Sequence, residues 1–235
     1  MSTRLTIAID GPSGAGKSTV ARMLAERLGY IYIDSGAMYR ALALLALETG
    51  INLDDGPALA KLASETDMSF QRHSPKMGEQ NNSSLHLLLA GRDVTEAIRS
   101  PEVTKAASLV SVHAGVRREL VERQRSLGRD GGVVMEGRDI GTKVFPEADV
   151  KIFLDAALDV RSQRRFHERE GPDRKTSAEV LRDIAERDRR DRERELSPLV
   201  PAADAVQIDS TQLPAEEVVD AILKIVEHKV KDKET

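Results

Sequence analysis

The chain has 235 residues, of which 40% are hydrophobic and 31% are charged, and its formal net charge is −4. This composition predicts a soluble globular protein, either one α/β domain with an insertion or at most two small domains. Aromatic residues make up 3% of the chain and tryptophan is absent, so base-stacking platforms for nucleic acid are not expected. Without cysteine, disulfides and thiolate metal sites are excluded. The longest apolar run, 41–47, is too short to span a membrane, and we expect a cytoplasmic protein without a signal segment.

The first predicted strand and helix flank a glycine-rich loop. Residues 5–9 are largely apolar, as in a buried strand, and apolar side chains then recur at helical spacing until Gly29. The loop fits the pattern G-x-x-x-x-G-K-[ST], whose backbone N–H groups point inward at phosphate oxygens. Lys17 is the expected cation for the β- and γ-phosphates, and the Ser18 hydroxyl is the expected Mg²⁺ ligand. The residues predicted to surround the nucleotide phosphates are Gly11, Pro12, Ser13, Gly14, Ala15, Gly16, Lys17, Ser18 and Thr19.

A second short strand, 30–33, ends in a polar stretch that leads into a helix containing residues 41–47. Polar residues at the carboxyl end of a strand lie where open α/β sheets bind ligands. Asp34 or Ser35 is also suited to cap the helix, and a capping role is compatible with a ligand role. Arg40 lies one turn into the helix, within reach of an anion.

The pattern changes between residues 66 and 99. Residues 68–70 and 85–89 are predicted to be short strands joined by a long polar loop over 71–84. This hairpin interrupts the α/β alternation, so we predict an inserted subdomain at 66–99. Helical spacing returns after residue 101.

Three further apolar strands are predicted at 131–135, 150–154 and 205–208, and polar residues follow each of them. An amphipathic helix is expected over 216–230. Apolar strands that alternate with helices imply a five-stranded parallel sheet with helices on both faces.

Residues 161–195 are rich in arginine and in acidic residues. One interpretation is a solvent-exposed helix with ion pairs at i,i+4 spacing. Another is that Arg161, Arg164, Arg165 and Arg169, which precede a Gly-Pro break at 171–172, lie on a short flexible loop. Arginines on such a loop can neutralise a phosphoryl group during transfer.

The end of the same segment contains a second arrangement of charges. Arg187, Asp191 and Arg194 are spaced to share one helical face. An Arg–Asp–Arg array can bind a sugar hydroxyl and a phosphate together, because the guanidinium group is planar and donates two parallel hydrogen bonds. This spacing therefore favours a role in binding a nucleotide.

Several motifs in this order resemble those of bacterial cytidylate kinases over nearly the whole chain. They are residues 9–17, 34–40, 137–142, 150–155, Glu186-Arg187-Asp188 with Asp191, and 198–204. The resemblance implies a nucleoside monophosphate kinase fold in a single P-loop kinase domain over 1–235, with a nucleotide-binding insertion at 66–99 and a lid at 161–175. It also implies transfer of the γ-phosphoryl group of ATP to CMP or dCMP, with Mg²⁺, in pyrimidine metabolism.

The resemblance assigns further residues to the acceptor nucleotide and to catalysis. The acceptor residues it implies are Ser35, Arg40, then Ser108, Arg117 and Asp139 around cytosine, Arg187 and Asp191 at the ribose, and Arg138 and Arg194 at the phosphate. The catalytic residues it implies are Lys17, Arg138, Arg161, Arg165 and Arg194. A carboxylate at position 139 can accept a hydrogen bond from the cytosine amine, whereas uracil presents a carbonyl there.

Other functions remain open at this point. One alternative is a kinase of the same fold that acts on another nucleotide or on a small metabolite, and a panel of acceptors separates these cases. A GTP-binding switch is disfavoured because no [NT]-K-x-D motif is present. A nucleic-acid-binding module is disfavoured by the interleaved acids of 161–194 and the scarcity of aromatics. We therefore expect CMP, dCMP and ATP as partners, and neither nucleic acid nor a membrane. We also expect a monomer, because the predicted helix 216–230 can be used entirely in packing within the chain.

Overall fold

The computed structural model describes residues 4–72, 85–168 and 176–234, and the structural statements below refer to these ranges. The chain forms two compact units, one made of Met1–Tyr32 and Leu127–Thr235, the other of Ile33–Ser126. Residues 73–84 of the predicted polar loop and 169–175 of the predicted lid lie outside the described residues. Within the described ranges, no helix is both long enough and apolar enough to cross a membrane.

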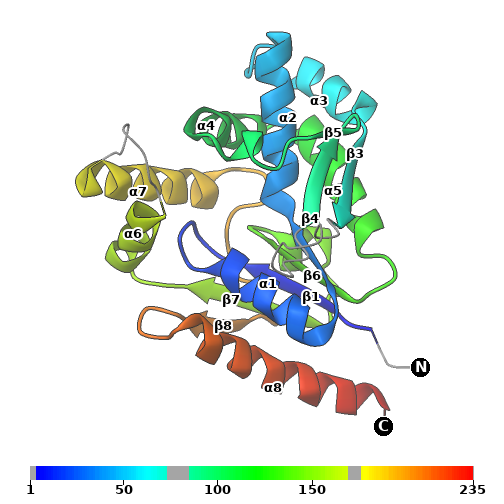
Figure 1. Cartoon of the computed structure of the whole chain (residues 1–235), viewed down its shortest axis with the longest axis vertical. Helices are drawn as coiled ribbons and strands as arrows, with labels where there is room; N and C mark the ends of the chain where they lie inside the picture. Colours follow the sequence, from blue (N-terminus) through cyan, green and yellow to red (C-terminus); the bar gives the residue numbers. More distant parts are fainter. Residues whose placement is uncertain (1–3, 73–84, 169–175, 235) are drawn as a thin grey trace, which may run out of the picture. The chain divides into compact units, whose positions relative to one another are not determined.

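β1 (Thr6–Asp10) is the central strand of a five-stranded sheet in the order β2–β6–β1–β7–β8 (Figure 1). The other four strands are β2 (Ile31–Asp34), β6 (Val133–Gly137), β7 (Val150–Asp155) and β8 (Val206–Asp209). β1 pairs in parallel with β6 and with β7, and β7 pairs in parallel with β8. The predicted parallel sheet is confirmed, and the loops that follow β1 and β6 leave the same edge of the sheet side by side.

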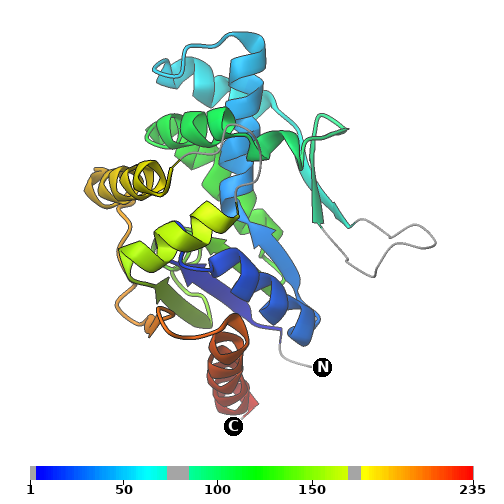
Figure 2. The same cartoon turned by 60° about the vertical axis from the view of Figure 1, so that its left-hand side comes forward.

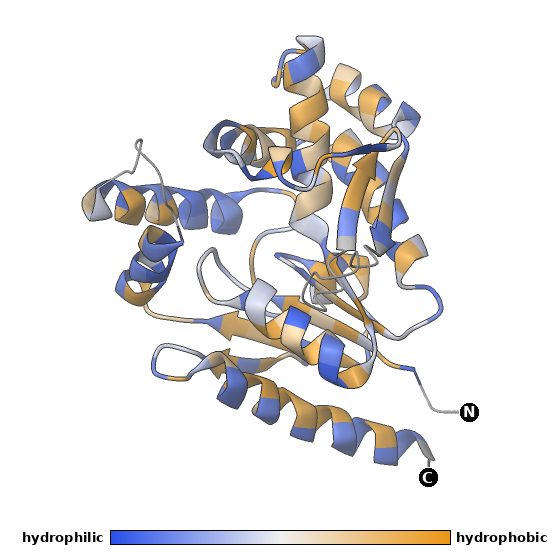
Figure 3. Cartoon of the chain, viewed as in Figure 1, coloured by the Kyte–Doolittle hydropathy of each residue, from blue (hydrophilic) through white to orange (hydrophobic). Residues whose placement is uncertain are grey.

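Alternate side chains of β1 point to opposite faces of the sheet. Ile7 and Ile9 are fully buried in a core shared with α1 (Lys17–Leu28) and α8 (Ala215–Glu234). Apolar residues recur along one side of α8 between polar ones (Figure 3), as expected of an amphipathic helix. On the other face, the side chain of Asp10 bonds to a π-helical turn, Ile140–Val144. Helical segments therefore cover both faces, as predicted.

Two charged helices, α6 (Leu158–His167) and α7 (Ser177–Glu193), pack against each other (Figure 2). α7 begins with a capping box, in which the Thr176 hydroxyl accepts from the Glu179 N–H and the Glu179 carboxylate accepts from the Thr176 N–H. Arg161, Arg164 and Arg165 lie within α6, a regular helix. The expectation that these three arginines lie on a flexible loop is therefore wrong.

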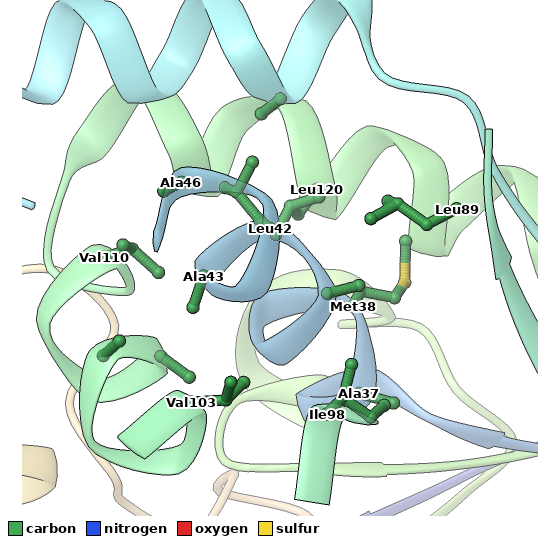
Figure 4. Close-up of a cluster of buried hydrophobic side chains, with 14 of the residues drawn as sticks. Ala37, Met38, Leu42, Ala43, Ala46, Leu89, Ile98, Val103, Val110 and Leu120 are labelled. Carbon is green, nitrogen blue, oxygen red and sulfur yellow. The ribbon is translucent and has the colours of Figure 1, made fainter. Parts of the chain in front are cut away.

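The second unit, Ile33–Ser126, has its own core around α2 (Ser35–Thr49). α2 is apolar on most of its sides, which is typical of a helix buried all round. Figure 4 shows Met38, Leu42 and Ala46 among side chains of the surrounding elements. Those elements include α3 (Gly56–Glu65), α4 (Pro101–Val110) and α5 (Ala114–Leu127).

The same unit contains an antiparallel sheet in the order β3–β4–β5, formed by β3 (Met68–Arg72), β4 (Leu85–Leu89) and β5 (Arg92–Asp93). The predicted hairpin is confirmed by the pairing of Met68 with Leu89 and of Phe70 with Leu87. Sequence patterns did not predict the short β5 or α3. They also did not predict the π-helical turn after β6.

Candidate active site

The loop between β1 and α1 is shaped by close packing against neighbouring backbone. A Cβ at Gly11 would lie 1.9 Å from the carbonyl oxygen of Leu154 in β7, so only glycine fits there. Gly14 has a φ of 78°, and a Cβ would lie 2.8 Å from the Arg161 carbonyl oxygen. Gly16 is the N-cap of α1 and supplies no side chain to the helix N-terminus. The first-turn N–H groups of α1 therefore suit an anion.

Lys17 is the first residue of α1 and is buried. Its Nζ donates a hydrogen bond to the Pro12 carbonyl oxygen at 2.6 Å. Burial, with a further contribution from the nearby Arg138 cation, lowers the pKa of Lys17 to about 7. Ser18 and Thr19, which follow in the first turn, are exposed to solvent. The structure thus places a buried amine and an exposed hydroxyl at one helix start.

Two carboxylates that the sequence analysis did not single out lie at the carboxyl ends of the central strands. Asp10 ends β1 with 4% of its surface exposed, and burial raises its pKa to about 6. Glu136 lies in β6, is also buried, and accepts a hydrogen bond from the Tyr32 hydroxyl at 2.6 Å. Both carboxylates act electrostatically on Lys17 and raise its pKa, although the effect of burial is larger. The sequence does contain a signal for these two residues, because Asp10 and Glu136 each directly follow a predicted apolar strand.

The fold gathers an arginine cluster, which we define as Arg138, Arg187, Asp191 and Arg194. The Nε of Arg138 donates to Asp191 Oδ2 at 2.9 Å, and Arg194 Nη1 lies 3.8 Å from Asp191 Oδ1. Burial alone would raise the pKa of Asp191, but the three arginines lower it below its usual value. Burial likewise opposes the charge of Arg138, but Asp191 raises the pKa of Arg138. Asp191 and Arg138 therefore hold each other in their charged forms.

Arg161 lies beneath the phosphate loop with 4% of its surface exposed. Its guanidinium group donates to the carbonyl oxygens of Ala156 at 2.8 Å and Ser13 at 3.1 Å, and to Asp188 Oδ2 at 2.6 Å. Arg161 thus ties α6 and α7 to the phosphate loop. Arg165 is half-buried and pairs at 2.9 Å with Glu168, the C-cap residue of its own helix. Among the contacts of the described residues, neither arginine bonds to the arginine cluster.

Of the remaining predicted acceptor residues, Asp139 is buried in the first unit, whereas the other four lie in the second unit. Asp34 is the N-cap of α2 and accepts from the Ala37 N–H at 3.1 Å, which decides the capping position in favour of Asp34 over Ser35. Ser35, the next residue, is buried. Arg40 forms an ion pair of 2.6 Å with Asp34. The end of β2 and the start of α2 therefore hold Arg40 in place, and its role at the acceptor nucleotide stays a prediction.

Ser108 and Arg117 belong to α4 and α5 of the same unit. Ser108 is half-buried, whereas Arg117 is buried. The guanidinium carbon of Arg117 lies 5.7 Å from the centre of the Tyr39 ring, and its Nη1 donates to the Ser111 carbonyl oxygen at 3.3 Å. Arg117 is thus fixed by a cation–π contact and a hydrogen bond.

A phosphate loop on the central strand of a parallel sheet, together with a cluster of half-buried arginines, places the chain among the phosphate-loop kinases. A family model described as cytidylate kinase matches residues 7–228. The chain belongs to the cytidylate kinase family.

Two relatives and one solved structure illustrate this similarity. The chain is 49% identical over 231 residues to the cytidylate kinase of Geobacillus sp. (strain WCH70), with 98% of this chain and 100% of that protein covered. It is 50% identical over 223 residues to the bifunctional pantoate ligase/cytidylate kinase of Synechococcus sp. (strain JA-2-3B'a(2-13)); these cover 94% of this chain but 40% of that longer protein. An uncharacterized protein from Eubacterium ventriosum ATCC 27560 aligns with a TM-score of 0.51 and 14% identity, over 96% of this chain and 99% of that chain. The last likeness concerns the fold alone.

Proposed function

We propose that the protein transfers the γ-phosphoryl group of ATP to CMP or dCMP, giving ADP and CDP or dCDP. The observation that carries this proposal is the arginine cluster, because three half-buried arginines around one buried, ionised Asp191 suit the phosphate and ribose of a nucleoside monophosphate. The cluster belongs to the same unit as the phosphate loop. Membership of the cytidylate kinase family supports CMP as the acceptor.

On the donor side, we assign the triphosphate of ATP to Gly11–Thr19. Lys17 and the N–H groups at the start of α1 would bind the β- and γ-phosphates. The exposed Ser18 hydroxyl suits Mg²⁺, which prefers oxygen ligands and commonly keeps few protein ligands besides the phosphates. Bound there, Mg²⁺ would neutralise phosphate charge.

On the acceptor side, the roles follow the family motifs. Asp139 would accept from the cytosine amine, with Ser108 and Arg117 donating to the ring acceptors. Arg187 and Asp191 would hold the ribose, and Arg138 and Arg194 the CMP phosphate. Ser35 and Arg40 would complete the acceptor site.

The chemistry needs positioning and charge neutralisation more than proton transfer. The attacking oxygen belongs to a phosphate that is already anionic at pH 7, so no general base is required. Lys17, Arg138 and Arg194 would neutralise charge during transfer. Arg161 and Arg165 are kept as candidates for this role, although Arg161 already holds the Ser13 carbonyl.

The remaining assignments follow from the same proposal. We infer a cytoplasmic monomer that acts in pyrimidine nucleotide metabolism, within a single kinase domain over 1–235. Residues 66–99 would form the nucleotide-binding insertion, and residues 161–175 would form the lid.

A panel of acceptors tests the function. ADP release from ATP–Mg²⁺ is measured with CMP, dCMP, UMP, AMP and GMP, and ATP alone gives the background. We expect rapid turnover with CMP and dCMP and at least tenfold less with AMP or GMP, because buried polar groups left without partners disfavour the wrong base by about 1–3 kcal/mol each. Turnover with AMP or GMP that equals turnover with CMP would contradict the cytosine assignment. ATP binding without turnover of any acceptor would contradict the kinase assignment.

A further inference from the structure

We propose that Asp10, although it directly precedes the phosphate loop, is a positioning residue for the acceptor nucleotide. This inference rests on the proposed function. Asp10 would act through the backbone that carries Arg138 and Asp139, without contacting the nucleotide itself.

The geometry of the Asp10 carboxylate supports this role. Its Oδ1 accepts from the Ile140 N–H at 2.8 Å, and its Oδ2 accepts from the Gly141 N–H at 2.7 Å. These two N–H groups belong to the residues that directly follow Arg138 and Asp139. Both carboxylate oxygens of Asp10 therefore bond to the segment that carries the proposed acceptor residues Arg138 and Asp139.

The segment is held on its other side as well. Gly137 pairs with Asp10 in the β1–β6 ladder. The Asp139 carbonyl oxygen accepts from the Lys143 and Val144 N–H groups at 2.8 and 3.2 Å, which closes the π-helical turn. Arg138 and Asp139 thus lie between two points that β1 anchors. Irregular turns of this kind recur at functional sites.

The turn packs closely against Asp10 at Gly141, where a methyl group would already be in van der Waals contact with the carboxylate. A Cβ on Gly141 would lie 3.4 Å from Asp10 Oδ2 and 3.3 Å from Lys151 Cδ. A buried carboxylate also needs hydrogen bonds to offset its loss of hydration, and the two N–H groups supply them. Asp10 and the turn therefore stabilise each other: the carboxylate accepts from two N–H groups of the turn, and these hydrogen bonds offset the burial of the carboxylate.

The test is the Asp10→Asn variant, assayed at pH 8 with ATP and CMP varied separately. The amide oxygen can accept from one of the two N–H groups, but the NH₂ group opposes the other. We expect the KM for CMP to rise by about tenfold to a hundredfold, while the KM for ATP changes by less than threefold. A general loss of structure would not produce this split between the two substrates.

A matched control exists at the other end of the same strand. Asp149 Oδ2 accepts from the Thr6 N–H at 2.7 Å, so Asp149→Asn also removes a carboxylate bonded to the β1 region. Both KM values should stay within threefold of wild type in this control. If Asp10→Asn fails to fold, Asp10→Glu is the second variant. It keeps the charge but lengthens the side chain by one methylene group, so it should displace the turn and raise the KM for CMP selectively.

The outcomes separate the two proposals. A wild-type protein that phosphorylates none of the acceptors overturns the proposed function and, with it, the role of Asp10. A wild-type protein that phosphorylates CMP, but whose variants raise both KM values equally or change neither, overturns the role of Asp10 alone. Amide hydrogen exchange gives a second reading: in Asp10→Asn, exchange should accelerate at Ile140 and Gly141 and stay unchanged at Val134, and no acceleration would also overturn the proposal.

Discussion

The phosphate loop contains a buried cation, Lys17, and the arginine cluster contains a half-buried one, Arg138, but the two are stabilised differently. Lys17 donates to a neutral carbonyl oxygen, that of Pro12, and burial lowers its pKa to about 7. Arg138 bonds to an ionised carboxylate, Asp191, which raises the pKa of Arg138 against the effect of burial. In the phosphate loop, Lys17 therefore has no carboxylate hydrogen-bonded to it. In the arginine cluster, Arg138 is hydrogen-bonded to its counter-ion, Asp191.

This difference indicates different contributions to the proposed reaction. The charge of Lys17 is best stabilised by phosphate oxygens, so the interaction strengthens as nucleotide charge arrives. The arginine cluster is already organised around Asp191, and it should bind the acceptor without rearranging its charges. Replacing Lys17 should therefore lower turnover most. Replacing Asp191 should weaken acceptor binding and lower stability.

The largest expected effect is that of Lys17→Met. Turnover should fall by at least about 10³-fold, since every tenfold loss corresponds to about 1.4 kcal/mol of transition-state stabilisation. The KM for CMP should stay within threefold, because Lys17 is assigned to the donor phosphates. Steady-state kinetics of both substrates measure this, and circular dichroism confirms the fold. Arg27→Met, which removes an exposed cation from the last turn of the same helix, is the control and should retain activity. Near-normal turnover in Lys17→Met would sink the donor assignment.

A smaller effect is expected from Asp191→Asn, which keeps the shape but removes the negative charge. The KM for CMP should rise by about tenfold to a hundredfold with little change for ATP, because Arg138 and Arg194 lose the carboxylate that orients them. Stability in urea at pH 7 should fall by about 3 kcal/mol, because the half-buried Arg138 and Arg194 lose their buried counter-ion. Asp183→Asn, on an exposed side of the same helix, should alter neither quantity.

The pH dependence of that stability difference gives a further check. The pKa of Asp191 is lowered in the folded protein, so its stabilising contribution is present above the pKa of the unfolded chain, about 3.9. The contribution is lost as pH falls through the lower folded value. The gap between wild type and Asp191→Asn should therefore be constant from pH 7 to about pH 5 and narrow below about pH 4. A gap that narrows already between pH 7 and pH 5 would contradict the assignment.

The two regions also differ in how far the sequence predicts them. The phosphate loop is contiguous, and its glycines are required by local backbone geometry, so a motif identifies it. The helical face shared by Arg187 and Asp191 follows from spacing alone. The contact between Asp191 and Arg138 does not follow from spacing, because these two residues are 53 positions apart in the chain. Only the family resemblance assigned both of them to one site.

Sequence periodicity also does not decide which charged side chain of a helix faces inward. Arg161 and Arg165 look alike in the sequence, yet Arg161 is buried under the phosphate loop and Arg165 is only half-buried. The partner of Arg161, Asp188, lies on another helix. Asp10 is similar, because its two hydrogen bonds depend on strand β6 lying beside β1. Such contacts are tertiary, and they become visible only after the strands are placed.

The smallest expected effect is a proton linked to ATP binding. At pH 8, a group with a pKa of about 7 is about nine-tenths deprotonated, so Lys17 is mostly neutral before ATP binds. Nearby phosphate charge raises its pKa again, and ATP binding should take up close to one proton. CMP binding should take up almost none, because Arg138 already keeps its proton and phosphates are fully ionised at pH 8. Titration calorimetry in buffers of different ionisation enthalpy measures both numbers. Equal uptake with the two nucleotides, or none with ATP, would remove the distinction between the two regions; uptake that persists in Lys17→Met would assign the proton to another group.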